Sequence, residues 1–536
     1  MAFRPEELAL DTPPVIFEDA SHSSGNTHTT PTKATWRPLY RHECAFGPPV
    51  FDSVMDNLIR NPNINSTWLF RADILHDAQD GPANPATPAD EADSLAFVAD
   101  IPSFVGFELQ RHVIRKLIPR NTLRDKPLDQ TCLIYKSNPG GEAVERTLVI
   151  YLPHVSTPSD MPFYHPVVKG IAFVHEWTPA ESCGSISLSY LFFDEQDRTV
   201  DKLIRTAFQL LMVIHKHGKG RVQGYQKRVH HDVLLPQARV QDTYTKLKQK
   251  HARSLIKGWA EQTDPEKHIF EDICIAAFMI ELWRDMYGEG PFPGFVDVGC
   301  GNGLLVHILN QEGFSGWGFD ARSRTSWASY STRVRSLSGE EQDSLRELVL
   351  LPTYVSRGGS GDGFDEQKAH DGVFPKGTFI ISNHADELTP WTPILAAVSD
   401  CPFISIPCCS HDLSGKLFRA SPPKDKTKAD STYSSFVGWV SEIAAECGWE
   451  VEQEMLRIPS TRNAAIVGRK RTGDISSVDV PALVHKYGGT AGYFDAVVRL
   501  MKQPPSTHEH EASDTGPSVG KKSKGKKPKQ KQHKAG

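Results

Sequence analysis

The feature that most constrains the fold is a short apolar segment that runs directly into three closely spaced glycines. Residues 295–305 read FVDVGCGNGLL, with the glycines at 299, 301 and 303. Glycine lets the backbone turn tightly and pass close to a ligand, and the first N–H groups of a following helix face outward toward negative charge. A strand, a glycine-rich turn and a helix in this order predict the opening unit of a parallel α/β sheet.

Two acidic residues near this turn indicate which ligand it binds. Enzymes that bind dinucleotides place G-x-G-x-x-G here to close on a pyrophosphate. This chain instead has G-x-G-x-G preceded by Asp297, which is the pattern of class I methyltransferases. Asp297 is expected to face the ammonium group of S-adenosylmethionine, and Asp320, at the end of the next strand, to accept its ribose hydroxyls. The alternative is an ordinary glycine-rich turn with two unrelated acids. The predicted cofactor-binding residues are Asp297, Gly299, Cys300, Gly301, Asn302, Gly303, Asp320 and Asn383.

The segments on both sides of this turn extend the α/β pattern. A helix is expected to begin at Thr263, because Thr263 and Glu266 fit a capping box and Pro265 suits the first turn. Expected strands at 295–299, 316–320, 347–355, 378–383 and 402–407 then alternate with helix-like segments, up to a closing strand pair at 451–469. We therefore predict a class I Rossmann-like methyltransferase domain at 263–502, with a sheet wound on both faces.

The rest of the chain divides by composition. Residues 1–35 are rich in Ser, Thr and Pro and are predicted to be disordered, as is the lysine-rich tail at 503–536. Residues 36–262 are predicted to form an α+β accessory region that binds RNA, with a long helix beginning at 201. No apolar run approaches the roughly 20 residues that a membrane-spanning helix needs, so no membrane segment is expected.

Charge and cysteine content narrow the choice of partners. The formal net charge is −5, yet residues 521–534 carry eight lysines and no acid, and residues 215–257 carry eleven Lys and Arg against two Asp. Local basic zones on an acidic chain favour binding of a polyanion at chosen places, the alternative being solvated surface. The nine cysteines form no CxxC pair, which is typical of reduced thiols in the cytosol or nucleus and predicts no metal site.

The segment after the strand 378–383 is expected to meet the transferred methyl group. Enzymes that methylate base amines usually place N-P-P-[YF] there, whereas this chain reads NHADELTPW at 383–391. The candidate proton acceptors are His384, Asp386 and Glu387, and we favour Asp386. The alternative for Asp386 is a hydrogen bond within the loop or a helix cap near Thr389.

Several of these motifs, taken together, resemble one family. VDVGCGNGLLVHILNQEGFSGWGFDARSRTSW, SNHADELTPW and SIPCCSHDLSGK are similar to the eukaryotic tRNA (uracil-2'-O-)-methyltransferase family, as are PFYHP, GYQKRVHHDVLLPQ and HKYGGTAGYFDAV. The resemblance extends in order over roughly residues 100 to 500. It implies methylation, with S-adenosylmethionine as donor, of the ribose of uridine 44 in serine tRNAs in the cytoplasm.

The resemblance also implies where tRNA binds. Together with the basic zones, it places tRNA on Arg120, Arg124, Lys227, Arg228, Lys246, Lys248, Lys250 and Arg253, with help from the lysine tail. Some family members carry a C-terminal Cys/His zinc finger, whereas this chain ends in lysines, so no metal is expected. The sequence leaves the oligomeric state open.

Two other functions compete with ribose methylation. Enzymes that methylate C5 of a pyrimidine attack C6 with a thiolate, and Pro407-Cys408 after a sheet strand is placed to supply one. A buried structural thiol is the plainer interpretation of Cys408. The other competitor is a non-catalytic RNA-binding protein with a degenerate methyltransferase fold. Against it, Asp297, the three glycines and Asp320 are all intact.

Overall fold

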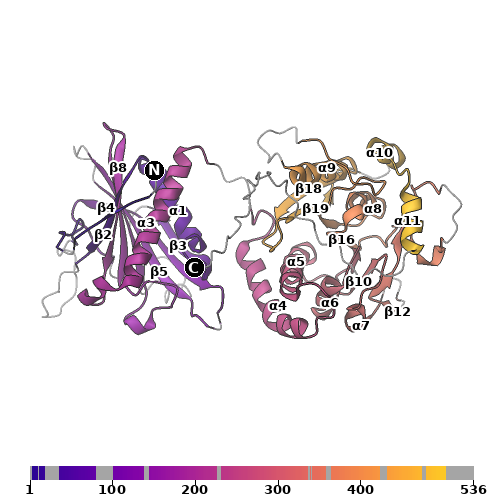
Figure 1. Cartoon of the computed structure of the whole chain (residues 1–536), viewed down its shortest axis with the longest axis horizontal. Helices are drawn as coiled ribbons and strands as arrows, with labels where there is room; N and C mark the ends of the chain where they lie inside the picture. Colours follow the sequence, from indigo (N-terminus) through magenta and orange to yellow (C-terminus); the bar gives the residue numbers. More distant parts are fainter. Residues whose placement is uncertain are drawn as a thin grey trace, which may run out of the picture. The chain divides into compact units, whose positions relative to one another are not determined.

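A computed structural model describes most of the chain as two compact units, residues 1–227 and residues 228–536 (Figure 1). The residues it describes are 3–9, 11–18, 35–79, 101–122, 124–137, 144–225, 231–335, 339, 341–357, 364–422, 431–473 and 478–502. Of the segments predicted to be disordered, all of 503–536 and residues 1, 2, 10 and 19–34 lie outside these ranges. The prediction is wrong for 3–9 and 11–18, because Glu6 and Glu7 pair with residues 40 and 41 in a sheet and Ile16 is buried in a core. Among the described residues, no helix is both long and apolar enough to cross a membrane.

The first unit is built on one antiparallel sheet of eight strands in the order β1-β2-β8-β7-β6-β5-β4-β3. Along this sheet most apolar side chains alternate between two buried faces, as a covered strand requires. The strands are β1 (Glu6–Glu7), β2 (Arg37–Cys44), β3 (Leu69–Gln79), β4 (Phe107–Pro119), β5 (Leu128–Ser137), β6 (Glu145–Pro153), β7 (Gly170–Thr178) and β8 (Cys183–Leu191).

Two helices cover one face of this sheet. The apolar sides of α1 (Pro48–Arg60) and α3 (Asp201–Val222) pack together on it through residues such as Phe51, Leu58 and Leu211. The segments around Ile16 and Phe104 pack on Trp36 and Tyr135 in a second core. The unit therefore has an apolar interior on both sides of its sheet.

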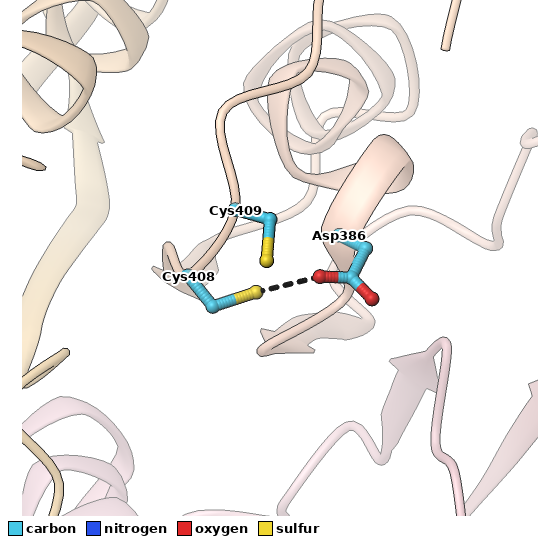
Figure 2. A group of neighbouring side chains, drawn as sticks. All are labelled: Asp386, Cys408 and Cys409. Carbon is cyan, nitrogen blue, oxygen red and sulfur yellow. Dashed lines mark hydrogen bonds between the residues drawn. The ribbon is translucent and has the colours of Figure 1, made fainter. Parts of the chain in front are cut away.

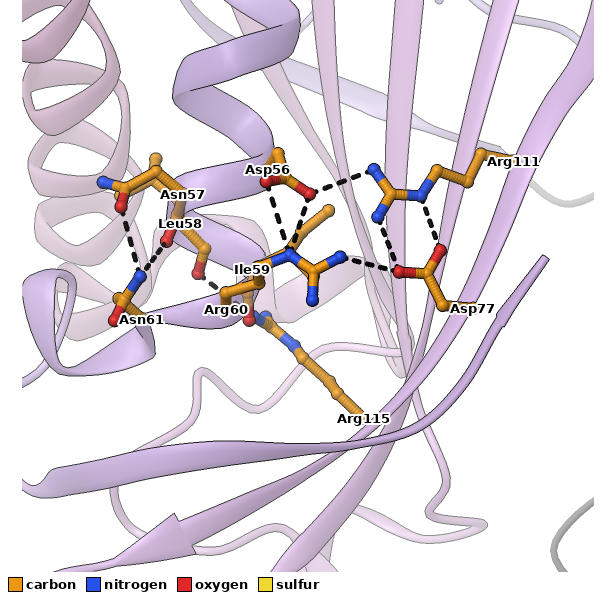
Figure 3. Close-up of polar contacts among 9 residues, drawn as sticks. All are labelled: Asp56, Asn57, Leu58, Ile59, Arg60, Asn61, Asp77, Arg111 and Arg115. Carbon is orange, nitrogen blue, oxygen red and sulfur yellow. Dashed lines mark hydrogen bonds and ion pairs between the residues drawn. The ribbon is translucent and has the colours of Figure 1, made fainter. Parts of the chain in front are cut away.

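A buried arginine fastens α1 to the sheet (Figure 3). The Arg115 guanidinium donates to the backbone carbonyls of Leu58 and Ile59, at 3.1 and 2.5 Å, and to Gln130 Oε1 at 2.6 Å. The last carbonyls of a helix have no partner within the helix. Arg115 thus supplies donors to carbonyls at the C-terminal end of α1.

The second unit is built on a seven-stranded sheet in the order β13-β10-β9-β16-β17-β19-β18. All neighbouring pairs are parallel except those of β19, which runs antiparallel to both β17 and β18. The strands are β9 (Phe295–Val298), β10 (Gly316–Asp320), β13 (Leu345–Glu347), β16 (Phe379–Asn383), β17 (Phe403–Ile406), β18 (Trp449–Met455) and β19 (Ala464–Arg471).

Helices pack on both faces of this sheet, as the alternating sequence pattern predicts. Alternate residues of β9 face different cores: Val296 and Val298 lie in one, and Phe295 lies in the other. The first core includes α8 (Thr392–Val398), α9 (Thr432–Glu446) and α11 (Tyr493–Lys502), and the second includes α4 (Gln237–Lys257), α5 (Pro265–Tyr287) and α6 (Leu304–Gln311).

Two boundaries also differ from the sequence prediction. The division between the units falls after Lys227 and not at 262, because α4 packs against α5 and buries Leu247 and Leu255 in the core of the second unit. The cap of α5 is Asp264 and not Thr263: its side chain accepts from the backbone N–H of Glu266 at 3.0 Å, with Pro265 in the first turn.

Candidate active site

The site lies where the sheet of the second unit changes direction. From β9 the chain proceeds outward to β10 and β13 on one side, and β16 and β17 follow on the other. Ligands of open α/β sheets bind beyond the carboxyl ends of the strands at such a point. The loops that follow β9 and β16 therefore form the candidate site.

The glycines after β9 have conformations that favour glycine. Gly299, Gly301 and Gly303 have φ of +76°, +52° and +75°, in the left-handed region. A Cβ at Gly303 would lie 2.5 Å from Leu345 Cδ1, and one at Gly299 would lie 3.0 Å from the Cβ of Ala385. A Cβ at Gly301 would meet no described atom within 4 Å. Gly299 and Gly303 thus permit close packing, whereas the space beside the Cα of Gly301 is open.

Three side chains hold the turn in place. Asp320 Oδ2 accepts from the backbone N–H of Gly301 at 3.0 Å. Ser326 Oγ donates to the Asn302 carbonyl at 2.8 Å, and Trp327 Nε1 donates to the Gly301 carbonyl at 2.9 Å. The predicted residues Gly301 and Asn302, after β9, and Asp320, at the end of β10, are therefore joined by one set of hydrogen bonds.

Asp297 carries a buried carboxyl group beside this turn. Its side chain is 2% exposed, and Oδ1 has no hydrogen-bond partner among the described residues. Burial raises the pKa of Asp297 well above its ordinary value, and the negative charges of Asp272 and Asp320 raise it further. The pKa of Asp272 is raised to about 8 by burial and by Glu271.

This cluster fits a cationic ligand. A buried carboxylate is costly unless it is paired, so grouped acids require either protons or a counter-cation. S-adenosylmethionine carries an ammonium and a sulfonium group. The sequence places the methionine portion of this cofactor at the unpartnered Asp297 oxygen and the open space beside Gly301.

A shallow, open cleft lies beside the residues that follow Asp320. Its lining includes Ala321, Arg322, Leu348 and Met501. That Asp320 accepts the ribose hydroxyls of the cofactor stays a prediction.

Asp272 and Glu271 were not predicted as site residues. They lie on α5, and they reach the loop after β16: Asn383 Nδ2 donates to Asp272 Oδ1 at 3.5 Å, and His384 Nε2 lies 3.1 Å from Glu271 Oε1. The signal in the sequence is a pair of acids inside the apolar helix IFEDICIAAF. Buried acids in such a run need a specific role.

The loop after β16 has an unusual backbone. His384 and Asp386 both have positive φ, +52° and +43°, which non-glycine residues rarely adopt. Such conformations persist where the surroundings enforce them, and they cluster at functional sites. Burial raises the pKa of Glu387, and Asp386 raises it further. All three candidate proton acceptors thus lie on a constrained loop at the carboxyl edge of the sheet.

Cys408 and Cys409 face Asp386 from the loop after β17 (Figure 2). The Cys408 thiol donates to Asp386 Oδ1 at 2.9 Å. The hydrogen bond with Cys409, burial and the Asp386 carboxylate together raise the pKa of Cys408. Donor atoms of the three residues lie within 4.8 Å of one another, an arrangement that also suits a thiophilic metal ion. That the chain needs no metal therefore stays a prediction.

The predicted RNA-binding residues lie on both units. Arg120 and Arg124 are exposed in the first unit, after β4. Lys246, Lys248, Lys250 and Arg253 are exposed on α4 in the second. Lys250 pairs with Glu312 at 2.8 Å, so part of its charge is neutralised. Lys227 and Arg228 lie outside the described residues.

Comparison with known proteins gives matches to both units. Residues 13–228 match the family described as "TRM44-like, N-terminal bet v1-like domain", and residues 234–343 match "Predicted AdoMet-dependent methyltransferase". Three similar proteins are each named tRNA (uracil-O(2)-)-methyltransferase. The protein of Neurospora crassa is 62% identical, covering 95% of this chain and 99% of its own. That of Schizosaccharomyces pombe is 39% identical, covering 88% and 94%, and that of Eremothecium gossypii is 37% identical, covering 88% and 97%.

Proposed function

The chain belongs to the tRNA (uracil-O(2)-)-methyltransferase family, and from this premise we propose that it methylates the 2'-hydroxyl of a uridine in tRNA with S-adenosylmethionine as donor. The finer assignment, uridine 44 of serine tRNAs in the cytoplasm, rests on the resemblance of the sequence motifs. The class I Rossmann-like fold of the second unit is supported by its strand order and by the glycine turn after β9.

The observation that carries the proposal is the packing of the loop after β16 on the glycine turn. A Cβ at Gly299 would touch Ala385, which lies between His384 and Asp386. The cofactor loop and the candidate proton acceptors are therefore immediate neighbours. When bound, S-adenosylmethionine supplies an electrophilic methyl group.

The chain must orient a weakly nucleophilic hydroxyl and accept its proton. Orientation alone contributes a large share of such rate enhancements, and a placed base contributes typically 10²–10⁴-fold. Asp386 is our candidate for the base, since the Cys408 thiol fixes its carboxylate. Glu271 fixes the His384 ring in turn, and Asp297 with Asp320 binds the cofactor.

The C5 alternative requires a thiolate at Cys408. A raised pKa keeps that thiol protonated near neutral pH, which favours ribose chemistry over attack on the base. A non-catalytic RNA-binding protein would not need an intact cofactor site. In this chain Asp297, the glycine turn and Asp320 form one connected site, which favours an enzyme.

The test is nucleoside mass spectrometry of tRNA after incubation with the protein and labelled cofactor. We expect 2'-O-methyluridine from the wild type and most of that activity from Cys408→Ser. Asp386→Asn should lose at least ~10²-fold in rate, with unchanged binding of cofactor and tRNA. A tRNA carrying 5-fluorouridine at the target should leave no protein adduct. A stable adduct that Cys408→Ser abolishes would establish C5 chemistry instead.

A further inference from the structure

Two large aromatic side chains lie side by side on the surface of the first unit. Trp68 is 43% exposed and Phe163 is 54% exposed, and their rings meet edge to face with centroids 5.4 Å apart. Single exposed apolar residues are common and need no explanation. A pair of exposed aromatic rings from separate segments does need an explanation, because both rings stay in contact with water and not with the apolar core.

Cations surround these rings. The Arg124 guanidinium lies 5.4 Å from the centroid of Trp68, and Lys202 Nζ lies 4.2 Å from that of Phe163. Beside them, the Arg120 guanidinium lies 5.4 Å from the centroid of Phe70. Arg120, Arg124 and Lys202 are all exposed. We call these six residues the Trp68 surface.

The fold holds this surface in place. The start of β3 pairs with the end of β4, so Trp68 and Arg120 are brought together, and Arg120 Nε donates to the Thr67 carbonyl at 2.8 Å. Tyr164 ties the Phe163 segment to the loop after β4 by donating to the Lys126 carbonyl at 2.8 Å. Beneath them lies a small core of Leu69, Leu117, Leu128, Met161 and Tyr164. The rings are thus presented by a packed base.

We propose that the Trp68 surface binds unpaired bases of the tRNA by stacking, while its cations bind the adjoining phosphates. The inference rests on the proposed function, which supplies tRNA as substrate, and it names the part of the molecule that selects single-stranded nucleotides. Aromatic faces interleaved with Arg and Lys are the means by which proteins bind unpaired nucleotides. The bases of an A-form duplex are already stacked, so a double helix offers these rings no partner.

The experiment measures tRNA affinity of the full chain and of four variants, Trp68→Ala, Phe163→Ala, Arg124→Gln and Lys202→Gln. Each aromatic variant should bind roughly 5- to 150-fold more weakly, the effect of losing one stacked base. Its salt dependence should stay as in the wild type, whereas each cation variant should lower the slope by roughly 0.7–0.9. Binding to a duplex RNA of similar length should be unchanged in the aromatic variants.

Phe17→Ala is the matched control. Phe17 is 46% exposed in the same unit, and its carbonyl accepts from Val105, just before β4 begins. The Trp68 carbonyl accepts from the backbone N–H of Arg120, just after β4 ends. Phe17 and Trp68 are therefore separated by the length of a 13-residue strand, roughly 40 Å. Phe17→Ala should bind tRNA like the wild type.

The outcomes separate this inference from the proposed function. If wild-type protein methylates tRNA while Trp68→Ala and Phe163→Ala bind tRNA with wild-type affinity, the stacking surface is wrong and the function stands. Equal weakening in Phe17→Ala would also overturn it. If the wild type binds tRNA through these rings but forms no 2'-O-methyluridine, the surface stands and the proposed reaction fails. Melting temperatures equal to that of the wild type establish that the variants are folded.

Discussion

Asp297, Asp272 and Asp320 place three acidic side chains around one turn, although burial penalises each ionised form. Backbone N–H groups offset part of that cost for Asp320. Asp297 has no such compensation at Oδ1 among the described residues. A cationic ligand would supply the missing partner of Asp297. The three acids that destabilise the cofactor-free protein when ionised would therefore stabilise the protein with cofactor bound.

Replacement of Asp297 or Gly301 should therefore abolish tight cofactor binding. Asp297→Ala removes a charged hydrogen-bond partner, which contributes about 1.5–3 kcal/mol, or roughly a 10- to 150-fold loss of affinity. Gly301→Val places a branched side chain where the backbone is open and φ is +52°. Gly438→Ala is the control, since a Cβ there meets no described atom and its φ is ordinary. Calorimetric titration measures all three; wild-type affinity in either site variant would refute the assignment.

The raised pKa of Asp272 makes the stability of the cofactor-free protein depend on pH. Its folded pKa of about 8 lies above the ordinary 3.8, so the folded state binds more protons than the unfolded state between these values. The stabilisation is complete below about pH 4 and is lost as the pH rises through about 8. We expect the melting temperature to fall from pH 6 to pH 9, and Asp272→Asn to flatten that decline. If the melting temperature of Asp272→Asn changed with pH as it does in the wild type, Asp272 would not be the cause of the decline.

Cofactor binding should have the opposite dependence. A cation favours the ionised carboxyl groups, so binding should release protons below about pH 8 and tighten as the pH rises toward that value. Titration calorimetry in two buffers of different ionisation enthalpy counts the protons released. The count should fall in Asp272→Asn.

Among the elements, α1 depends on one buried side chain. Arg115 donates to two carbonyls in the last residues of α1 and to Gln130. Nearby, Arg111 and Arg60 both pair with Asp56 and Asp77 closer to solvent (Figure 3). Exposed pairs contribute little, whereas buried acceptors without donors are costly.

We expect Arg115→Ala to lower the stability of the first unit by about 3 kcal/mol or more, since each buried acceptor left without a donor costs ~1–3 kcal/mol. Arg60→Ala is the control, because its side chain is 44% exposed and its pairs contribute under ~1 kcal/mol. Hydrogen exchange of amides in 35–225 reports the change. Cofactor binding should persist in both variants. Equal protection in Arg115→Ala and Arg60→Ala would contradict the role of Arg115.

The elements that the sequence could predict are those with a local signal. β9, β10, β16 and β17 coincide with the expected strands within a residue or two, because short apolar runs bounded by glycine, proline or polar residues are typical of buried parallel strands. The segment 347–355 was expected to form a longer strand. It contributes only the last residue of β13 and the two-residue β14 (Val349–Leu350), because Pro352 offers no N–H to extend the pairing.

The side chains that the sequence could not place are those brought together by tertiary packing. Glu271 and Asp272 precede the glycine turn by more than twenty residues, and only the packing of α5 against the sheet brings them to Asn383 and His384. Trp68 and Phe163 are likewise joined by strand pairing and a small core. Spacing along the chain carries no record of such contacts.

At the scale of the whole molecule, the cations that we assign to tRNA are divided between the units. The Trp68 surface belongs to the first unit, while α4 belongs to the second. Lys246, Lys250, Arg253 and Lys257 recur at helical spacing and are exposed, so they form one basic stripe on α4. Both units are therefore expected to contribute to tRNA affinity, with base and phosphate contacts from the first and phosphate contacts from the second.

The members of this stripe should not contribute equally. Lys246→Gln and Arg253→Gln should each lower the salt dependence of tRNA binding by a slope of roughly 0.7–0.9, the effect of one lost phosphate contact. Lys250→Gln should lower it less, because Glu312 already neutralises part of that charge at 2.8 Å.

Lys376→Gln is the control for this series. It removes an exposed cation of the same unit that pairs with Asp400 at 2.7 Å and lies on the segment before β16 rather than on α4, and it should leave the slope unchanged. Affinity measured across a range of salt concentrations gives each slope. The loss of slope should be smallest in the Lys376 variant, intermediate in the Lys250 variant and largest in the Lys246 and Arg253 variants. Equal slopes in the Lys246, Arg253 and Lys376 variants would mean that α4 does not face the RNA. Because aromatic variants of the first unit should change affinity without changing the slope, the two sets of measurements together separate the stacking contacts of the first unit from the phosphate contacts of both units.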